Sequence, residues 1–186
     1  MEFADVVRRR RMVRRFDPSR PVPRELLVRV LDVARRAPSA GWSQGTELLV
    51  LEGADAAPLW EAPVVVVPLS HKQAYLDRYS LPDKAEAGMD REEAWPVPYW
   101  DVDAAFAAML LLLAAVDEGL GALFFGLFRG KESVVAAAGV PAAYRPIGGV
   151  ALGYPAPGER SRPSWTGGRR PFDDVVHFTR WRGAAR

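Results

Sequence analysis

The sequence of 186 residues contains no cysteine and only two histidines, His71 and His177. The absence of cysteine excludes disulfide bonds, thiolate metal sites and cysteine nucleophiles. The two histidines lie far apart in the sequence and have no pattern of carboxylates beside them. We therefore favour surface or core roles for both histidines and predict that the protein has no metal site.

Long hydrophobic runs are also scarce. The longest apolar run has thirteen residues, 104–116, whereas a membrane-spanning helix needs about 20. The first residues, MEFADVV, include two acidic side chains and no long apolar stretch, unlike a signal peptide. These features predict a cytoplasmic protein without a membrane partner.

The overall composition is that of an ordinary globular protein, with 49% hydrophobic residues, 26% charged residues and a formal net charge of +2. The length suits a single domain, residues 1–186, with one core. The small net charge hides an uneven distribution, because eleven of the 22 arginines lie in the first 36 residues and seven follow position 159. If the two ends meet in the fold, they form one positive pocket.

The densest cluster of arginine is residues 8–15, with six arginines in eight positions. Arg10 and Arg14 would share one face if a helix continued through them. Two or three guanidinium groups suffice to bind a phosphate, because their paired N–H donors match its oxygens. Two alternatives remain at this point, a solvated helix end and a nucleic-acid surface, although Phe16 is the only aromatic residue nearby.

The hydrophobic periodicity predicts an α+β protein in which a sheet is covered by helices. We expect helices over residues 2–11, 23–37, 103–119 and 131–140, and strands over 46–53, 62–70, 121–128 and 145–156. Residues 71–100 mix charges, prolines and aromatics without a steady period. We interpret this stretch as a capping excursion that faces the substrate.

The helix over residues 103–119 is the strongest single prediction. Asp103 is a plausible N-cap, Gly119 or Gly121 a plausible stop, and residues 104–116 are apolar on every face. A helix of this kind must be buried on all sides, and in a chain of this size that burial often requires a second subunit. We therefore expect a homodimer with this helix at its centre.

Other familiar site patterns are absent from the sequence. Ser39 lies in a loop but not in a G-x-S-x-G elbow, so a hydrolase nucleophile is not supported. The segments RGKESV and LGYPAPG lack the glycine spacing of phosphate-binding and dinucleotide-binding loops.

Five segments, taken in order, resemble the nitroreductase family of flavin enzymes. They are RRRRMVRRFDP, APSAGWSQG, DAAFAAMLLLLAAVDEGLGALFFG, VPAAYRPIGGVALGYP and GGRRPFDDVVHF. Each motif alone is weak, but together they cover nearly the whole chain with plausible spacing. The resemblance implies a nitroreductase-like fold, with a mostly antiparallel central sheet covered by helices and a long buried helix at a dimer interface.

The resemblance also implies a site for flavin mononucleotide (FMN). One of Arg10 and Arg14 would contact the phosphate and the other the pyrimidine edge of the flavin ring, while the tail would approach the phosphate. The loop over residues 38–44 would reach across the dimer to the flavin of the other subunit, and a backbone N–H within residues 124–126 would face the flavin N5. The implied cofactor-binding residues are Arg10, Arg11, Met12, Arg14, Pro38, Ser39, Ala40, Gln44, Phe124, Phe125, Gly126, Arg169 and Arg170.

The chain departs from the family pattern at three places. Met12 stands where the family has a serine, so Arg11 or a backbone N–H would have to replace a hydroxyl contact to phosphate. Trp42 stands where an amide side chain is common, which offers a stacking surface instead. No match exists for the Asn/Lys pair that some members carry after the first strand.

We expect four aromatic residues to face the substrate. They are Trp42, Trp95, Tyr99 and Trp100. For the last three, packing in the core or at the dimer interface is the alternative.

The function implied by the resemblance is that of an FMN-dependent oxidoreductase. NAD(P)H would deliver hydride to the flavin, and a small organic acceptor such as a nitroaromatic or a quinone would then take its place in a ping-pong cycle. Such a cycle needs no catalytic acid or base from the protein. The alternatives are other flavin chemistry (dehydrogenation, dehalogenation or flavin cleavage), a flavin carrier or regulator, and a nucleic-acid-binding module.

Overall fold

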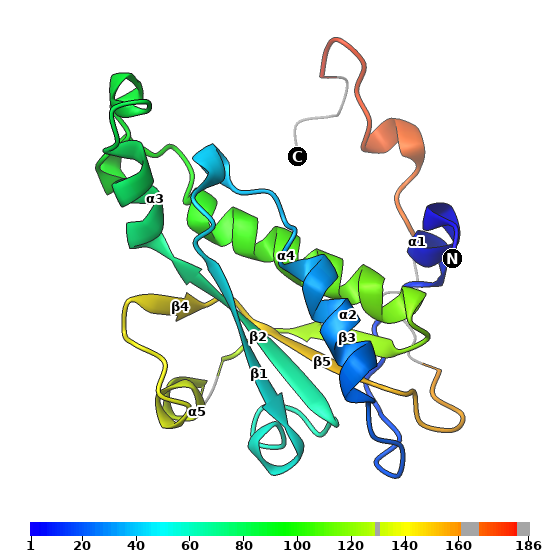
Figure 1. Ribbon diagram of the computed structural model, residues 1–186. Helices are drawn as coiled ribbons and strands as arrows, with labels where there is room; N and C mark the ends of the chain where they lie inside the picture. The colour runs from blue at the N-terminus through cyan, green and yellow to red at the C-terminus, as the bar shows by residue number, and fades with distance from the viewer. Residues whose placement is uncertain (129–130, 161–167, 182–186) are drawn as a thin grey trace.

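The computed structural model describes residues 1–128, 131–160 and 168–181 of the chain (Figure 1). The helices are α1 (Phe3–Arg9), α2 (Arg24–Ala34), α3 (Lys72–Tyr79), α4 (Tyr99–Asp117) and α5 (Lys131–Ala137). The strands are β1 (Thr46–Glu52), β2 (Val64–His71), β3 (Gly121–Phe125), β4 (Tyr144–Pro146) and β5 (Gly149–Gly153). Short 3₁₀ helices cover Ala40–Trp42, Gly53–Asp55, Ala85–Ala87, Glu92–Ala94 and Phe172–Asp174.

The five strands form one antiparallel sheet in the order β1-β2-β5-β3, with β4 paired to β2 beside β5. Seven of the eight residues of β2 are buried, which matches its run of valines and its central place in the sheet. The expectation of a mostly antiparallel sheet in an α+β fold is therefore confirmed.

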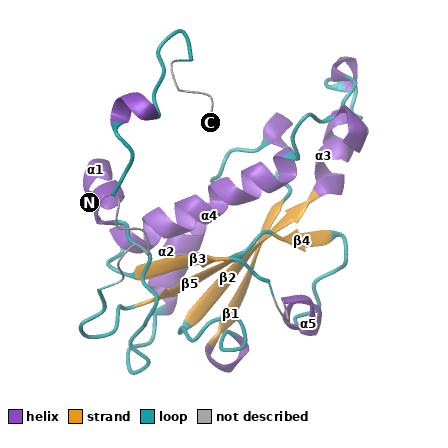
Figure 2. Ribbon diagram, turned by 180° about the vertical axis from the view of Figure 1, so that it is seen from behind, coloured by secondary structure: helices purple, strands orange, loops and turns teal. Residues whose placement is uncertain are grey.

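Helices α2 and α4 pack together on one face of the sheet. Leu27 and Val30 of α2 and Leu111 of α4 share one core with Val66 and Val150 of the strands. On the opposite face, a second core gathers around Val65 and Val67, and α5 and the segment after β1 contribute to it (Figure 2). The sheet is therefore covered on both sides.

Three sequence predictions need correction. Helix α4 begins at Tyr99 after Pro98, so the assignment of Asp103 as its N-cap is wrong; the Asp103 side chain is buried and binds two donors from other elements. The predicted strand over 145–156 is two strands that pair with β2 in the same antiparallel sense, with a one-residue shift in register between Pro146 and Gly149. Residues 71–100 are more regular than predicted, since they include α3.

Helix α4 is long and apolar enough to cross a membrane by length and composition alone. Half of that window is buried, however, and the helix packs against α2 and the sheet, as a core helix does. In the single chain, Phe106 and Met109 of this helix are 46% and 50% exposed, so burial on all sides would require the second subunit that the sequence analysis expects. One apolar stripe of α4 is therefore uncovered.

The carboxy-terminal segment, residues 168–181, extends away from the body of the protein. Both ribbon views place it next to α1, at the end of the molecule that holds the amino terminus (Figures 1 and 2). Its apolar side chains Phe172, Phe178 and Trp181 are exposed, and the ring contacts of Phe172 and Phe178 are with each other. This part of the chain therefore offers apolar surface outside the core.

Candidate functional site

The arginine-rich segment after α1 runs beside the edge strand β3. Met12 forms a parallel bridge with Ala122, and the Val13 N–H donates to the Ala122 carbonyl at 2.9 Å. Gly121 permits this approach, because a Cβ there would lie 2.8 Å from the Val13 side chain. Beyond this bridge the segment pairs with the chain that follows β5, where Phe16 forms an antiparallel bridge with Pro155. Its later residues therefore lie towards the start of β3, where Gly121 pairs with Gly153.

The helix predicted over residues 2–11 ends at Arg9, so Arg10 and Arg14 do not share a helix face. Beyond the helix, Val13 is buried, Met12 packs against both cores, and Arg14 and Arg15 both line one pocket beside Phe16 and Trp60. The placement of Arg10 and Arg14 at a flavin phosphate stays a prediction.

Glu159 binds two other arginines of this segment. Arg15 Nε donates to Glu159 Oε2 at 3.0 Å, and Arg11 Nη1 donates to the Glu159 carbonyl at 3.0 Å. The Glu159 side chain is buried. Arg11 and Arg15 therefore attach the segment to the start of the tail, and the sequence analysis missed the role of Glu159.

Trp60 connects Arg14 with the end of β3. Its indole Nε1 donates to the Arg14 carbonyl at 3.2 Å, and its ring centroid lies 4.9 Å from that of Phe125. Trp60 follows β1, where the sequence comparison found no equivalent of the family's Asn/Lys pair. The structure thus brings Arg14 and residues 124–126 together through a residue that sequence reasoning did not select.

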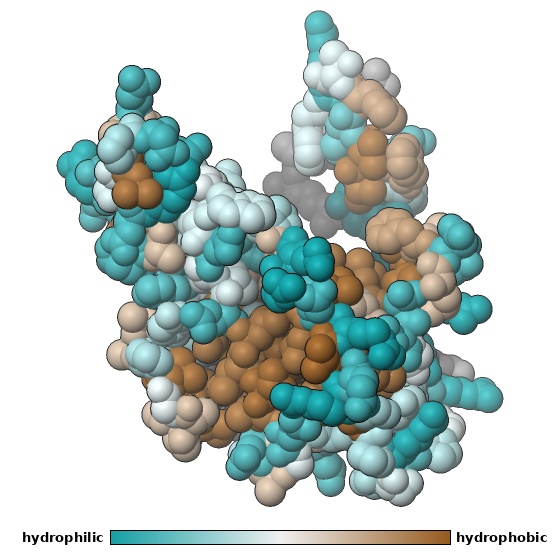
Figure 3. Space-filling view, in the orientation of Figure 1, coloured by the Kyte–Doolittle hydropathy of each residue, from teal (hydrophilic) through white to brown (hydrophobic). Residues whose placement is uncertain are grey.

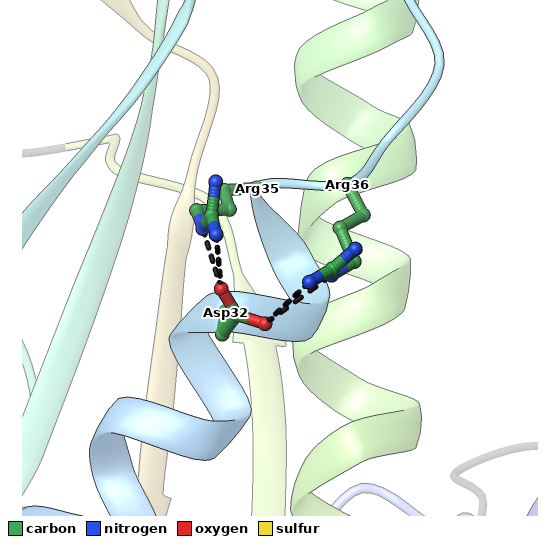
Figure 4. Close-up of polar contacts among 3 residues, drawn as sticks. All are labelled: Asp32, Arg35 and Arg36. Carbon is green, nitrogen blue, oxygen red and sulfur yellow. Dashed lines mark hydrogen bonds and ion pairs between the residues drawn. The ribbon is translucent and has the colours of Figure 1, made fainter.

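Other amino-terminal arginines are occupied locally. Asp32 of α2 binds both Arg35 and Arg36 (Figure 4), and these hydrogen bonds hold the pKa of Asp32 below its usual range. Arg29 donates to both oxygens of Glu118. The excess of arginine in the first 36 residues is therefore only partly available to an anion.

The loop over residues 38–44 lies at the amino-terminal part of α4. The Ala40 N–H and the Tyr75 hydroxyl both donate to Asp103 Oδ2 at 2.8 Å, and Arg78 Nε donates to the Gly41 carbonyl at 2.8 Å. The loop is compact, because the Gln44 N–H donates to Ser39 Oγ at 3.0 Å. These contacts fix the loop against α3 and α4.

The same loop has an unusual backbone. Gly41, Trp42 and Gln44 have φ angles of 61°, 61° and 51°, and a left-handed conformation is uncommon for residues such as Trp42. The Trp42 side chain is 74% exposed. The loop therefore exposes the large aromatic ring of Trp42 at the surface of the single chain.

The other aromatic residues expected at the substrate differ in exposure. Trp95 and Trp100 are buried around Tyr75, and the Trp95 indole donates to the Met89 carbonyl at 2.8 Å. This burial favours the packing alternative for both tryptophans. Tyr99 is partly exposed at the start of α4.

Helix α4 separates the two halves of the expected site. The loop binds Asp103, whereas the amino terminus of the chain, just before α1, forms an ion pair with Asp117. At 1.5 Å per residue, these two positions on α4 are about 21 Å apart. Arg169 and Arg170 lie on the extended tail, and the Arg170 guanidinium donates to the Asp174 carbonyl at 2.6 Å.

No group of three or more histidine, aspartate or glutamate side chains in the described residues could hold a metal ion. The groups described above for this region are arginine side chains, aromatic rings and backbone N–H and carbonyl groups.

The sheet, the long helix α4 and the arginine segment beside the edge strand define the α+β fold of the nitroreductase structures. A nitroreductase family protein from Streptococcus pneumoniae has this fold, with a TM-score of 0.75 and 21% identity over 95% of this chain and 100% of the other. The sequence profile of the Nitroreductase family matches residues 7–154, and the chain belongs to this family.

Three further proteins are similar to this chain. A protein of Methanothermobacter thermautotrophicus, provisionally named an NADH dehydrogenase/NAD(P)H nitroreductase, is 25% identical over 97% of this chain and 88% of its own length. A nitroreductase-like protein from Exiguobacterium sibiricum, solved in complex with FMN, has a TM-score of 0.74 and 22% identity over 96% and 97% of the two chains. A protein of Staphylococcus epidermidis described as an NAD(P)H:FMN oxidoreductase has a TM-score of 0.71 and 22% identity over 95% of each chain.

Proposed function

We propose that this protein is an FMN-dependent oxidoreductase that takes hydride from NAD(P)H and reduces a small organic acceptor. The observation that carries the proposal is the position of the segment with Arg10 and Arg14 beside β3, where Trp60 links it to Phe125. The names of the relatives from Methanothermobacter and Staphylococcus, and the FMN complex from Exiguobacterium, support the same activity.

The residues of this region fit the chemistry of FMN. A phosphate dianion needs two or three cationic donors, and Arg10 and Arg14 would supply two from one short segment. The tail segment that carries Arg169 and Arg170 lies on the side of the molecule where α1 lies. Residues 124–126 supply backbone groups at the end of β3 for the ring. When bound there, FMN would supply the hydride-transfer chemistry.

The protein's own residues then have positioning and electrostatic roles. Trp60 fixes the Arg14 backbone through its carbonyl, so that the Arg14 guanidinium starts from a defined place. A cation there would stabilise negative charge on the reduced ring. No acid or base is assigned a proton transfer, in line with the ping-pong cycle that we propose.

A homodimer completes the proposed site. The loop over residues 38–44 is separated from Arg10 by most of the length of α4, so a second copy would bring its own loop to this chain's arginines. We expect a second copy to cover two surfaces: the exposed stripe of Phe106 and Met109 on α4, and a groove between α2 and β1 whose apolar lining includes Val28, Leu31 and Leu48. Figure 3 shows a broad hydrophobic area on the face of the molecule seen in Figure 1. We propose a cytoplasmic dimer with two flavins.

The absorption spectrum of the purified protein tests the proposal. We expect a flavin spectrum that bleaches on anaerobic addition of NADH or NADPH and recovers when a nitroaromatic or a quinone is added. A yellow protein whose flavin is reduced by neither NADH nor NADPH would support the alternatives, a flavin carrier or other flavin chemistry. A colourless protein that does not take up FMN would overturn the proposal.

Replacement of Arg14 gives a residue-specific prediction. Arg14→Ala should weaken FMN retention about tenfold or more, since a charge-assisted hydrogen bond is lost, and it should slow reduction by NAD(P)H. The control is Arg36→Ala, which removes only an exposed ion pair to Asp32. Flavin content and reduction rates equal to those of the control would rule out the assignment of Arg14.

A further inference from the structure

A cavity with a mainly apolar lining and two charged side chains lies at the end of β3. It has a volume of about 740 Å³ and is formed by the first part of α4, the end of β3 and the segment around β4. Ala105, Phe124 and Ile147 make its apolar walls, and Asp101 and Arg145 contribute the charged groups. Of these residues, only Phe124 belongs to the expected flavin site.

An ion pair with Asp101 holds the Arg145 guanidinium in place. The guanidinium donates through Nη2 to Asp101 Oδ2, while the buried Ser70 hydroxyl donates to Asp101 Oδ1 at 2.7 Å. The Asp101 side chain is 16% exposed and that of Arg145 is 68% exposed. Both carboxylate oxygens are therefore occupied, and the cation is the outer, accessible member of the pair.

Arginine carries five N–H donors, and the bond to Asp101 uses one of them. The remaining donors can meet a ligand oxyanion with two parallel hydrogen bonds. Because Asp101 lies on the inner side of Arg145, its negative charge is farther from such a ligand than the guanidinium is. An arginine positioned in this way discriminates by charge and by shape.

The Phe124 ring provides a flat wall in the same cavity. It rests against the backbone of Gly148, where a Cβ atom would lie only 2.5 Å from the ring. The glycine therefore fixes the ring position, and Phe124 remains 36% exposed. A planar ligand can stack on this ring while a substituent reaches Arg145.

We propose that this cavity binds the electron acceptor, that the preferred acceptors are planar aromatic compounds carrying a carboxylate or a similar oxyanion, and that Arg145 determines this preference. The inference rests on the proposed flavin chemistry, because Phe124 lines this cavity and also belongs to the segment, residues 124–126, that is expected to face the flavin. It goes beyond that function, since it assigns a substrate class and a specificity-determining residue.

Steady-state kinetics with a matched pair of acceptors tests the inference. The acceptors are 4-nitrobenzoate and its neutral amide, 4-nitrobenzamide, and the variant is Arg145→Gln. We expect the KM for 4-nitrobenzoate to rise about tenfold, as for the loss of a charge-assisted hydrogen bond, with the KM for the amide and both kcat values unchanged. Arg24→Gln is the control, because Arg24 is also 68% exposed and paired with one carboxylate.

Three outcomes would overturn the proposal. Equal changes in KM for the acid and the amide would show that Arg145 does not recognise charge. No change for either compound would place the acceptor elsewhere. A raised KM for NADPH relative to NADH, with 4-nitrobenzoate unaffected, would assign the oxyanion to the nicotinamide nucleotide instead of the acceptor.

Equilibrium binding separates this inference from the proposed function. Calorimetric titration with benzoate and benzamide needs no turnover, and we expect benzoate to bind more tightly and to lose that advantage in Arg145→Gln. This result in a protein that NAD(P)H does not reduce would retain the site while the proposed function fails. Reductase activity without any preference for benzoate would overturn the site and leave the function standing. Phe124→Leu should weaken both ligands equally, and an unequal effect would contradict the stacking role of the ring.

Discussion

The Asp103 carboxylate shows how much one buried group can organise. It accepts hydrogen bonds from the Ala40 N–H and the Tyr75 hydroxyl, so that it joins the loop over residues 38–44 to both α3 and α4. A buried donor or acceptor that loses its partner costs about 1–3 kcal/mol. Trp42 and Gln44, which have left-handed backbone conformations, come just after Ala40 in the chain. Their backbone strain is tolerated because the hydrogen bonds to Asp103 fix the loop.

The hydrogen bond between Tyr75 and Asp103 should affect how the free energy of unfolding depends on pH. Burial, followed by the hydrogen bond to Asp103, raises the pKa of Tyr75 well above its usual value of 10.0. Above pH 10 the unfolded chain releases this proton while the folded chain keeps it, so the folded state loses stability as the pH rises. One such group contributes a slope of about 1.4 kcal/mol per pH unit.

We therefore predict that the free energy of unfolding falls above pH 10 and that Tyr75→Phe makes the decline shallower. Urea denaturation at pH 9, 10 and 11 measures it. Tyr99→Phe, a change at a partly exposed tyrosine, is the control. Identical slopes in the wild type and in Tyr75→Phe would show that Tyr75 does not remain protonated in the fold.

The side-chain contacts of the site were the hardest part to predict from sequence. Arg10, Arg14 and residues 124–126 follow from the motif resemblance, and their contacts with a flavin stay predictions. The structure places Met12 of this segment beside β3 and joins the Arg14 carbonyl to the Phe125 ring through Trp60. Trp60 and Glu159 were missed, since neither belongs to a recurring motif and both act through contacts distant in sequence. Asp103 was misassigned because an acid near a helix start is usually a cap, and only tertiary contacts reveal its partners.

At the level of elements, periodicity predicted the helices and strands well where one face is apolar. It failed where tertiary pairing overrides local preference. The arginine segment after α1 leaves the helix because the edge of β3 offers the Val13 N–H a carbonyl partner, whereas six adjacent guanidinium groups would repel one another on a helix. Helix α4 begins earlier than predicted, because Pro98 precedes its first turn.

The exposed stripe of α4 leads to a prediction about assembly. If a second copy covers this stripe, Met109→Asp should place a charge in the interface, reduce the apparent mass in sedimentation to that of one chain, and lower flavin retention. Leu81→Asp is the control, because Leu81 is 48% exposed, close to the 50% of Met109, but lies outside α4. A Met109→Asp protein with the mass of a dimer would place the interface elsewhere.

At the scale of the whole molecule, the chain carries the parts of its proposed site in separate places. The arginines after α1 and the tail lie at one end of α4, and the loop over residues 38–44 lies at the other. The apolar residues of the tail extend beyond the core. In the dimer that we propose, a single chain with this layout would be half of a functional unit. The resemblance to the family already implies such a dimer, because the order of the motifs is visible in the sequence.

If the loop of one chain completes the site of the other, two impaired variants should restore each other's activity. A chain with Arg14→Ala keeps its loop, and a chain with Gly41→Val, in which the new Cβ would lie 2.6 Å from the Tyr79 ring, keeps its arginines. Random pairing of the two variants in equal amounts gives about half mixed pairs, each with one undamaged centre, so about a quarter of normal activity should return. Activity that stays at the level of the separate variants after unfolding and joint refolding would mean that each chain builds its centre alone.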